Sequence, residues 1–171
     1  MKTRDVALTA LFIAMVCVAT MVVRIPIPQT NGYMNLGDSM VLLAAVAFAP
    51  WQAFMVGGVG SALADLFGGY PQWAIWTLII KGVEALAAGG VLRLLKIPTS
   101  RISVPQIVAF IMAAAWMVLG YYAAESFMYD SKAALAELPA NIVQASGSVI
   151  LASLLMPAMQ RFLVSRSAEE K

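Results

Sequence analysis

The sequence of 171 residues contains no histidine, a single cysteine and few charged residues. The absence of histidine excludes imidazole metal sites and histidine-based catalysis. Cys17 lies inside an apolar segment and has no second cysteine for a disulfide, so we interpret it as a small buried hydrophobic residue. Charged residues make up only 12% of the chain and hydrophobic residues 61%, whereas a soluble domain carries about a quarter charged residues. This composition predicts an integral membrane protein, with the lipid bilayer around it.

Several motifs are also missing. The sequence has no G-x-x-x-x-G-K-[ST] phosphate loop, so the chain does not hydrolyse ATP by that route. The first apolar stretch, 6–23, is longer than the core of a typical signal peptide, and no A-x-A cleavage pattern follows it. We therefore expect a retained first helix. The sequence shows no repeat and no soluble domain, so we expect one membrane domain over 1–171. We expect no metal, no cofactor and no nucleic-acid partner.

Proline and glycine divide the apolar sequence into six predicted helices. These cover approximately 6–23, 39–49, 51–66, 72–95, 104–128 and 138–163. The predicted fold is an all-α integral membrane protein, a bundle of six transmembrane helices. One alternative stays open, in which the charge-free stretch 39–64 forms a single tilted span and the bundle has five helices.

Basic residues test the topology. With both termini in the cytoplasm, eight basic residues lie inside: Lys2, Arg4, Arg93, Lys96, Arg101, Arg161, Arg166 and Lys171. Only Arg24 and Lys132 lie in outside loops, and Lys81 lies within a helix. This distribution follows the positive-inside rule, and the five-helix alternative follows it less well. The sequence therefore predicts a multi-pass protein of the cell membrane with both termini cytoplasmic.

Polar and aromatic residues gather in the outer half of the predicted bundle, where ionisable groups are costly and indicate function. We predict that they form a binding pocket open to the outside. The candidate substrate-binding residues are Asn31, Tyr33, Asn35, Asp65, Trp73, Trp76, Lys81, Glu84, Tyr121, Glu125, Asn141 and Gln144.

Each candidate also has a structural interpretation, and both stay open. Lys81 and Glu84 share a helix face and can neutralise each other. Asn141 and Gln144 belong to a polar stripe that can join helices, and the tryptophans can belong to the outer aromatic belt. Asp38, which leads directly into an apolar run, is expected to cap the second helix rather than to bind a ligand.

Small residues follow one face of the first helix, at Ala7, Ala10 and Ala14. Small side chains at this spacing let another helix approach closely. The face can pack inside the bundle or dock a partner subunit.

Five stretches occur in an order and spacing that resemble a known family: T-A-L-F-I-A-M, N-L-G-D-S, A-P-W, G-S-A-L-A-D-L-F-G-G-Y and K-G-V-E-A. They are similar to the substrate-binding S components of energy-coupling factor (ECF) vitamin transporters, over about residues 3–95. The resemblance implies a six-helix protein that binds a vitamin or precursor from outside and is not an enzyme. It also implies a transmembrane coupling subunit and two cytoplasmic ATPases as partners, with Ala10 and Ala14 docking the coupling subunit. The outer loop after the first helix, 25–37, would cover the pocket.

The ligand is predicted from charge and ring surface. Acidic residues outnumber Lys81 in the outer half, which disfavours an anionic ligand, and the aromatic residues offer flat surfaces for a ring. We expect a small neutral or cationic heteroaromatic molecule, of the pyridoxine or hydroxymethylpyrimidine type ahead of riboflavin. The alternative is a solitary ion-coupled secondary transporter of a small polar solute, in which Lys81 and Glu84 form the coupling pair.

Overall fold

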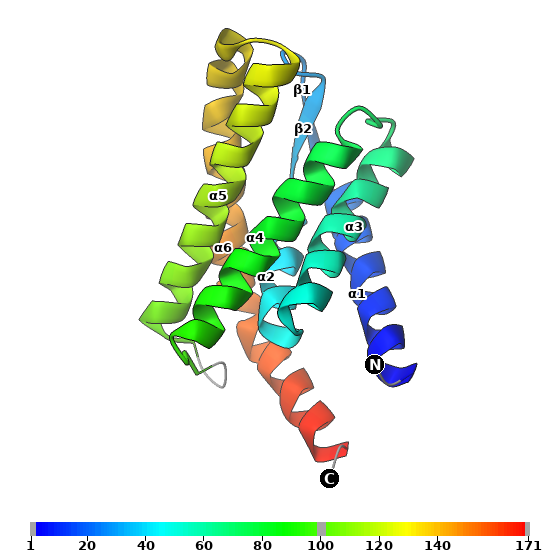
Figure 1. Ribbon diagram of the computed structural model, residues 1–171, viewed down its shortest axis with the longest axis vertical. Coiled ribbons are helices and arrows are strands. Elements are labelled where there is room, and N and C mark those ends of the chain that lie inside the picture. Colours follow the sequence, from blue (N-terminus) through cyan, green and yellow to red (C-terminus); the bar gives the residue numbers. More distant parts are fainter. Residues whose placement is uncertain (1–2, 99–101, 170–171) are drawn as a thin grey trace.

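Six α-helices and one β-hairpin form the described part of the chain, residues 3–98 and 102–169 with side chains to residue 165, in a computed structural model. In chain order they are α1 (Thr3–Val22), β1 (Arg24–Ile27), β2 (Gly32–Asn35), α2 (Asp38–Ala47), α3 (Pro50–Gly68), α4 (Ala74–Leu94), α5 (Val104–Met128) and α6 (Ser131–Glu169). The hairpin lies at one end of the bundle, and both chain ends lie at the other (Figure 1).

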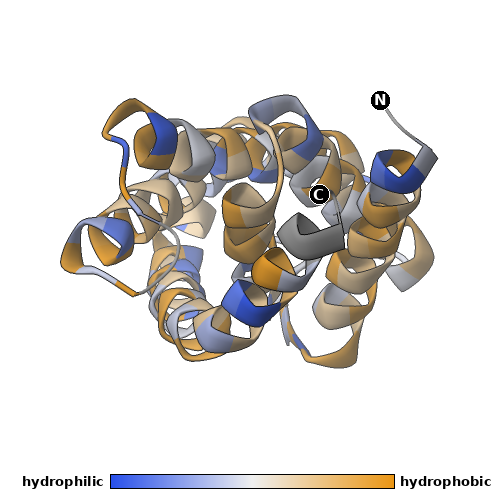
Figure 2. Ribbon diagram, turned by 90° about the horizontal axis from the view of Figure 1, so that it is seen from below, coloured by the Kyte–Doolittle hydropathy of each residue, from blue (hydrophilic) through white to orange (hydrophobic). Residues whose placement is uncertain are grey.

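Four of the described helices are long and apolar enough to cross a membrane: α1, α4, α5 and α6. Their outward faces carry large exposed hydrophobic side chains, such as Leu119, Phe127 and Leu154. Seen from the end that carries the termini, hydrophobic segments form much of the outer side of the bundle (Figure 2). Water does not favour such a surface, whereas lipid does.

The short helix α2 lies at the centre of the bundle. It packs against α1, α3, α4 and α6, and eight of its ten residues are buried. Its last carbonyl groups are satisfied from α4, because the Arg93 guanidinium donates hydrogen bonds to the carbonyl oxygens of Ala45 and Phe48. Pro50 then begins α3 at its first turn, where the missing N–H of proline costs nothing. The predicted break between the second and third helices is therefore confirmed.

Glycines on α3 let it approach α4 closely. A Cβ atom on Gly57 would lie 2.8 Å from the carbonyl oxygen of Lys81, and one on Gly58 would lie 2.6 Å from that of Leu78. Both distances are shorter than real Cβ contacts, so only glycine fits here. The close contact brings the polar residues of α3 and α4 next to each other at the hairpin end.

The segment between α1 and α2 is a hairpin rather than the plain loop that the sequence predicts. Its strands pair antiparallel, with Arg24 opposite Asn35 and Ile27 opposite Gly32. Asn31 takes the left-handed conformation with φ 47°, which Asn and Gly favour in hairpin turns. The Asn31-Gly32 dipeptide is a sequence signal for this hairpin, whereas Pro26 is a residue that strands disfavour.

The last helix begins earlier than the sequence predicts. Residue 138 was the expected start, but α6 begins at Ser131, because Asp130 Oδ1 accepts hydrogen bonds from the backbone N–H groups of Lys132 and Ala133 at 2.8 Å. This is the geometry of a helix cap. Pro139 then lies inside the helix, which membrane helices tolerate.

The predicted capping role of Asp38 is wrong. The helix α2 begins at Asp38 itself, after Gly37, and its start has no side-chain capping hydrogen bond. The Asp38 carboxylate is 1% exposed and points into the bundle, where it binds Lys81 and Gln144. A buried ammonium group without a carboxylate partner costs more free energy than a helix end without a side-chain cap.

Candidate ligand-binding site

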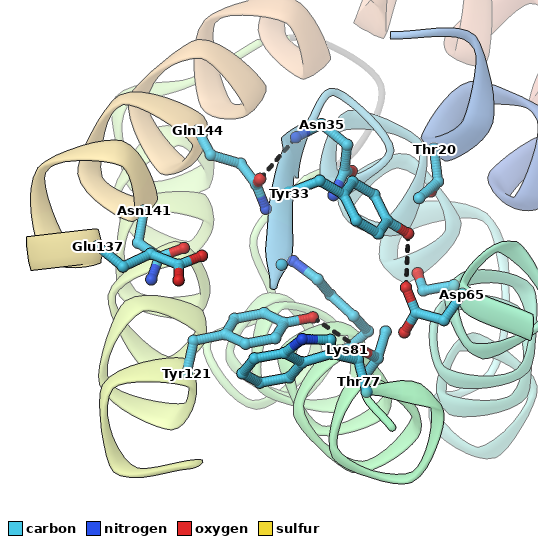
Figure 3. Close-up of a pocket in the computed structure, with 13 residues that line it drawn as sticks. Thr20, Tyr33, Asn35, Asp65, Thr77, Lys81, Tyr121, Glu137, Asn141 and Gln144 are labelled. Atoms are coloured by element: carbon cyan, nitrogen blue, oxygen red, sulfur yellow. Dashed lines mark hydrogen bonds between the residues drawn. The ribbon is translucent and has the colours of Figure 1, made fainter. Parts of the chain in front are cut away.

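A small cavity, which we call the hairpin cavity, lies where the hairpin meets α1, α3, α4, α5 and α6 (Figure 3). It is lined by Thr20, Gly32, Tyr33, Asn35, Ser61, Asp65, Trp73, Thr77, Lys81, Tyr121, Glu137, Asn141 and Gln144. The free space inside is about 30 Å³, which holds a water molecule but no vitamin. A larger ligand therefore enters only if the surrounding side chains move apart.

The structure brings eight of the twelve candidate residues together around this cavity. They are Tyr33, Asn35, Asp65, Trp73, Lys81, Tyr121, Asn141 and Gln144. They come from the hairpin and four helices, so their proximity depends on the fold and not on local sequence.

The other four candidates lie outside the lining. Asn31 is exposed in the hairpin turn, and Trp76 packs its ring 5.6 Å from the exposed Phe127. Glu84 and Glu125 are fully buried behind the lining. Glu84 lies 3.5 Å from the ammonium of Lys81, and Glu125 accepts a 3.0 Å hydrogen bond from the amide of Asn141.

Five lining residues were absent from the sequence prediction: Thr20, Gly32, Ser61, Thr77 and Glu137. The small hydroxyl residues carry no distinctive sequence signal inside apolar helices. Glu137 was placed in a polar loop, and its position changes because α6 begins at Ser131, about two turns earlier. A search for acidic residues near a helix start would have found it.

A chain of buried polar contacts crosses the base of the cavity. The ammonium of Lys81 on α4 donates to Asp38 Oδ1 on α2, and Asp38 Oδ2 accepts a 2.9 Å hydrogen bond from Gln144 Nε2 on α6. Gln144 Oε1 in turn accepts the backbone N–H of Asn35 at 2.8 Å. These contacts join three helices to the hairpin, and each group in the chain fixes the orientation of the next.

The hairpin is held over the cavity by side-chain hydrogen bonds. The Tyr33 hydroxyl donates to Asp65 Oδ1 at 2.5 Å (Figure 3), the Thr30 hydroxyl donates to Glu137 Oε2, and the Trp73 indole donates to the Asn31 carbonyl oxygen at 3.2 Å. Burial, and then the nearby Asp65 carboxylate, raise the pKa of the Tyr33 hydroxyl above its ordinary value. It therefore remains a hydrogen-bond donor at neutral pH.

Aromatic rings form one wall of the cavity. The rings of Trp73 and Tyr121 lie 6.0 Å apart, and the Tyr121 hydroxyl donates to Thr77 Oγ1 at 3.1 Å. The Lys81 ammonium lies 5.2 Å from the centre of the Tyr121 ring. Flat rings beside buried polar groups suit a ligand that is itself an aromatic ring with polar substituents.

Comparison with protein families identifies the chain. The model of the family described as "ECF-type riboflavin transporter, S component" matches residues 1–161. The chain belongs to this family. The resemblance found from the sequence is confirmed.

Relatives and a solved structure agree with this S component assignment. An uncharacterized protein from Pyrococcus woesei is 43% identical over 140 residues, which cover 80% of this chain and 88% of that protein. The thiamine precursor transporter HmpT of Lactococcus lactis is 28% identical over 159 residues, covering 92% and 89% of the two chains. The solved S component of a bacterial ECF transporter shares the fold, with a TM-score of 0.58, 17% identity, and coverage of 99% of this chain and 96% of the other.

This S component family is a family of transporter subunits and not a family of enzymes. The lining of the hairpin cavity holds carboxylates, amides, hydroxyls and the Lys81 ammonium. Among residues 3–98 and 102–165, no group of three acidic or cysteine side chains comes together to hold a metal ion.

The small-residue face of α1 is exposed. Ala7, Ala10 and Ala14 all lie on the outer surface, away from the faces of α1 that pack on α2 and α3. An apolar groove continues this face along Ala14, Met15, Val18, Ala19 and Met40. In this S component the alanines are therefore not used to pack the described part of the bundle.

Proposed function

We propose that this protein is the membrane subunit that captures a small heteroaromatic vitamin or vitamin precursor from outside the cell and passes it to the other subunits of an ECF transporter. The observation that carries the proposal is the hairpin cavity, which places buried polar side chains and two aromatic rings under a hairpin held by hydrogen bonds. Such a combination of apolar walls and a few oriented polar groups is typical of small-molecule sites.

The ligand is proposed to be of the hydroxymethylpyrimidine or pyridoxine type ahead of riboflavin. The family model carries the riboflavin name, whereas the relative from Lactococcus lactis is named for a thiamine precursor. The small free space in the cavity and its acidic lining, with Asp65 and Glu137, support a compact ligand without negative charge. All twelve candidate residues remain proposed ligand contacts or supports, with Glu84 and Glu125 acting through Lys81 and Asn141.

A transmembrane coupling subunit and two cytoplasmic ATPases are the proposed partners. The exposed Ala7, Ala10 and Ala14 face of α1 supports the docking of a helix from the coupling subunit. The proposed location is the cell membrane, with both termini cytoplasmic and the hairpin outside. The basic residues Arg93 and Lys96 lie at the end of α4 away from the hairpin, which fits this orientation.

The first experiment is to find the ligand. Protein purified gently in detergent from cells grown in rich medium is examined by native mass spectrometry for a bound small molecule. Thermal unfolding is then measured with hydroxymethylpyrimidine, pyridoxine and riboflavin. A bound vitamer together with a thermal shift of several degrees supports the proposal. An empty protein that shows no shift with any vitamin contradicts it.

A substitution on α1 separates binding from transport. Ala10→Trp adds a bulky ring to the proposed docking face but lies far from the hairpin cavity, so ligand affinity should stay within about twofold while uptake with the partner subunits is abolished. Ala115→Trp, on the exposed face of α5, is the matched control and should spare both. Loss of binding with retained transport would reverse the proposed division of roles.

The same uptake assay tests the solitary transporter. The buried Asp38, Lys81 and Glu84 cluster resembles a coupling site for an ion. A solitary transporter would accumulate solute in liposomes when reconstituted alone, whereas an S component would only bind it. Ligand accumulation by the chain alone would favour this second function.

A further inference from the structure

Two carboxylates, Asp65 and Glu137, lie in the described lining of the hairpin cavity and restrict the chemistry of a ligand. The inference rests on the proposed function, because it concerns what the same cavity binds. The two cationic side chains nearest the cavity are both engaged: Lys81 by Asp38 and Glu84, and Arg24 by the Gly68 carbonyl oxygen at 3.2 Å. The positive charge of Lys81 is therefore already balanced by carboxylates of the protein.

Asp65 supplies the best-defined free acceptor. Its side chain is 2% exposed and lines the cavity from α3. Oδ1 accepts from Tyr33, but Oδ2 is buried without a hydrogen-bond partner in the described part of the chain. The Thr77 hydroxyl also interacts with this carboxylate, without a hydrogen bond of normal geometry to Oδ2. A buried carboxylate oxygen without a donor is costly to the protein, and a ligand donor would remove that cost.

Glu137 supplies a second acceptor on the opposite side. It extends from α6, whereas Asp65 extends from α3 across the cavity (Figure 3). Glu137 Oε2 accepts from Thr30, and Oε1 lies 3.3 Å from the position that a Cβ atom on Gly32 would occupy. Any side chain larger than glycine would therefore crowd this carboxylate. The two acids lie on opposite sides of the same space.

Ser61 complements Asp65 on the same helix. It lies one turn before Asp65 on α3, is 2% exposed and also lines the cavity. Residues four apart share a helix face, so an acceptor and a hydroxyl donor are presented side by side. An amino-substituted ring with an adjacent ring nitrogen offers the complementary pair: the amino group donates, and the ring nitrogen accepts.

We propose that Asp65 determines specificity by accepting a hydrogen bond from an exocyclic amino group of a nitrogen heterocycle. Ser61 donates to the neighbouring ring nitrogen, and Glu137 accepts from a second donor on the opposite edge of the ligand. The ligand class is an aminopyrimidine that carries a hydroxymethyl group. A dioxo ring such as that of riboflavin has no exocyclic amino group and carries a carbonyl oxygen on each side of its ring N–H, so it fits this arrangement poorly. A site built to accept a hydrogen bond discriminates strongly against an analogue that lacks the donor.

The test uses two probes of nearly equal size. One is 4-amino-5-hydroxymethyl-2-methylpyrimidine, and the other is 5-hydroxymethyl-2-methylpyrimidine, in which a hydrogen replaces the amino group and the donor is lost. Affinities for the wild-type protein in detergent are measured by calorimetry. We expect the amino probe to bind at least about tenfold more tightly, as for hydrogen bonds to charged groups. This comparison needs no variant, so it does not depend on how a substitution affects folding.

Two variants assign the preference to Asp65. Asp65→Asn keeps the shape of the side chain and an oxygen that accepts from Tyr33, but it adds an amide donor. The variant should bind the amino probe about tenfold or more weakly than the wild-type protein. The ratio of the affinities for the two probes should then be near one. Asp130→Asn is the control with the same change of side chain, because Asp130 is exposed and does not line the cavity. It should leave the ratio unchanged.

The outcomes separate this inference from the proposed function. Equal binding of the two probes, or a ratio that survives Asp65→Asn, overturns the role of Asp65. Tight binding of riboflavin or pyridoxine with no binding of either pyrimidine also overturns the inference, while the protein remains a vitamin-binding subunit. If no vitamin binds at all, the proposed function fails together with it.

Discussion

Removal of the Asp38 charge should destabilise the protein, because the buried Lys81 ammonium then loses one of its two carboxylate partners, and Asp38→Asn tests this expectation. Both side chains are 1% exposed, and the ammonium lies between Asp38 and Glu84. The variant keeps one side-chain oxygen, which can still accept the hydrogen bond from Gln144 on α6. The negative charge is removed, and an amide NH2 group replaces the oxygen that accepts from the Lys81 ammonium. The substitution therefore breaks the ion pair while the contact with Gln144 is kept.

The expected magnitude follows from burial. Removing one partner of a buried ion pair costs about 3–5 kcal/mol, because the other charge is left without compensation. Here Glu84 remains 3.5 Å from Lys81, so we expect the lower end, about 3 kcal/mol. For a chain of this size each kcal/mol lowers Tm by about 2–4 °C. Asp38→Asn should therefore lower Tm by about 6–12 °C.

Thermal unfolding of the purified protein in one detergent, followed by tryptophan fluorescence, measures this difference. Asp130→Asn is the control: it removes an exposed negative charge, and asparagine caps a helix as well as aspartate does, so Tm should change by less than about 2 °C. A similarly small change for Asp38→Asn would refute the reasoning. It would mean that Glu84 alone balances the ammonium and that Asp38 serves only to orient Gln144.

Two further predictions concern packing and the hairpin. Gly58→Ala places a Cβ 2.6 Å from the backbone oxygen of Leu78 and should destabilise the protein by about 1–3 kcal/mol, as overpacking does. The control is Gly90→Ala, which has nothing within 4 Å of its Cβ and should leave Tm unchanged or slightly raised. Equal effects of the two variants in thermal unfolding would contradict the close packing of α3 on α4. Tyr33→Phe removes the hydrogen bond to Asp65 and should speed ligand dissociation several-fold in stopped-flow measurements. The control is Tyr70→Phe, because the Tyr70 ring lies 4.7 Å from the Tyr33 ring. Equal dissociation rates for the two variants would show that the hydrogen bond does not hold the hairpin.

The helices could be predicted from the sequence because their signals are local. The charge-free runs and the breaks at Pro50 and Gly69 gave bounds within a few residues of the structure for the first five helices. The last helix was placed too late because 129–137 was interpreted as a polar loop, while the cap at Asp130 was overlooked. Pro139 lies inside this helix, where neighbouring groups in a membrane protein compensate for its missing N–H.

The polar residues were harder to assign, because their partners are distant in the sequence. Asp38 has the local pattern of a helix cap, yet it binds Lys81, 43 residues away, and Gln144, 106 residues away. Glu84 looked equally suited to the cavity, but the rotation of α4 against α3, fixed by close packing at Gly57 and Gly58, turns it behind Lys81. Sequence spacing shows which residues share a face, but only packing shows what that face meets.

The buried polar chain links the proposed ligand site to the hairpin. Lys81 holds Asp38, Asp38 holds Gln144, and Gln144 holds the backbone of Asn35. Lys81, Gln144 and Asn35 also line the cavity, so a ligand that contacts any of them competes with or reinforces the bonds that position the strand β2. We therefore expect capture of the proposed ligand and the position of the hairpin to be coupled through the same few atoms. This structural role accounts for Asp38 and Lys81, two of the buried ionisable groups of this S component.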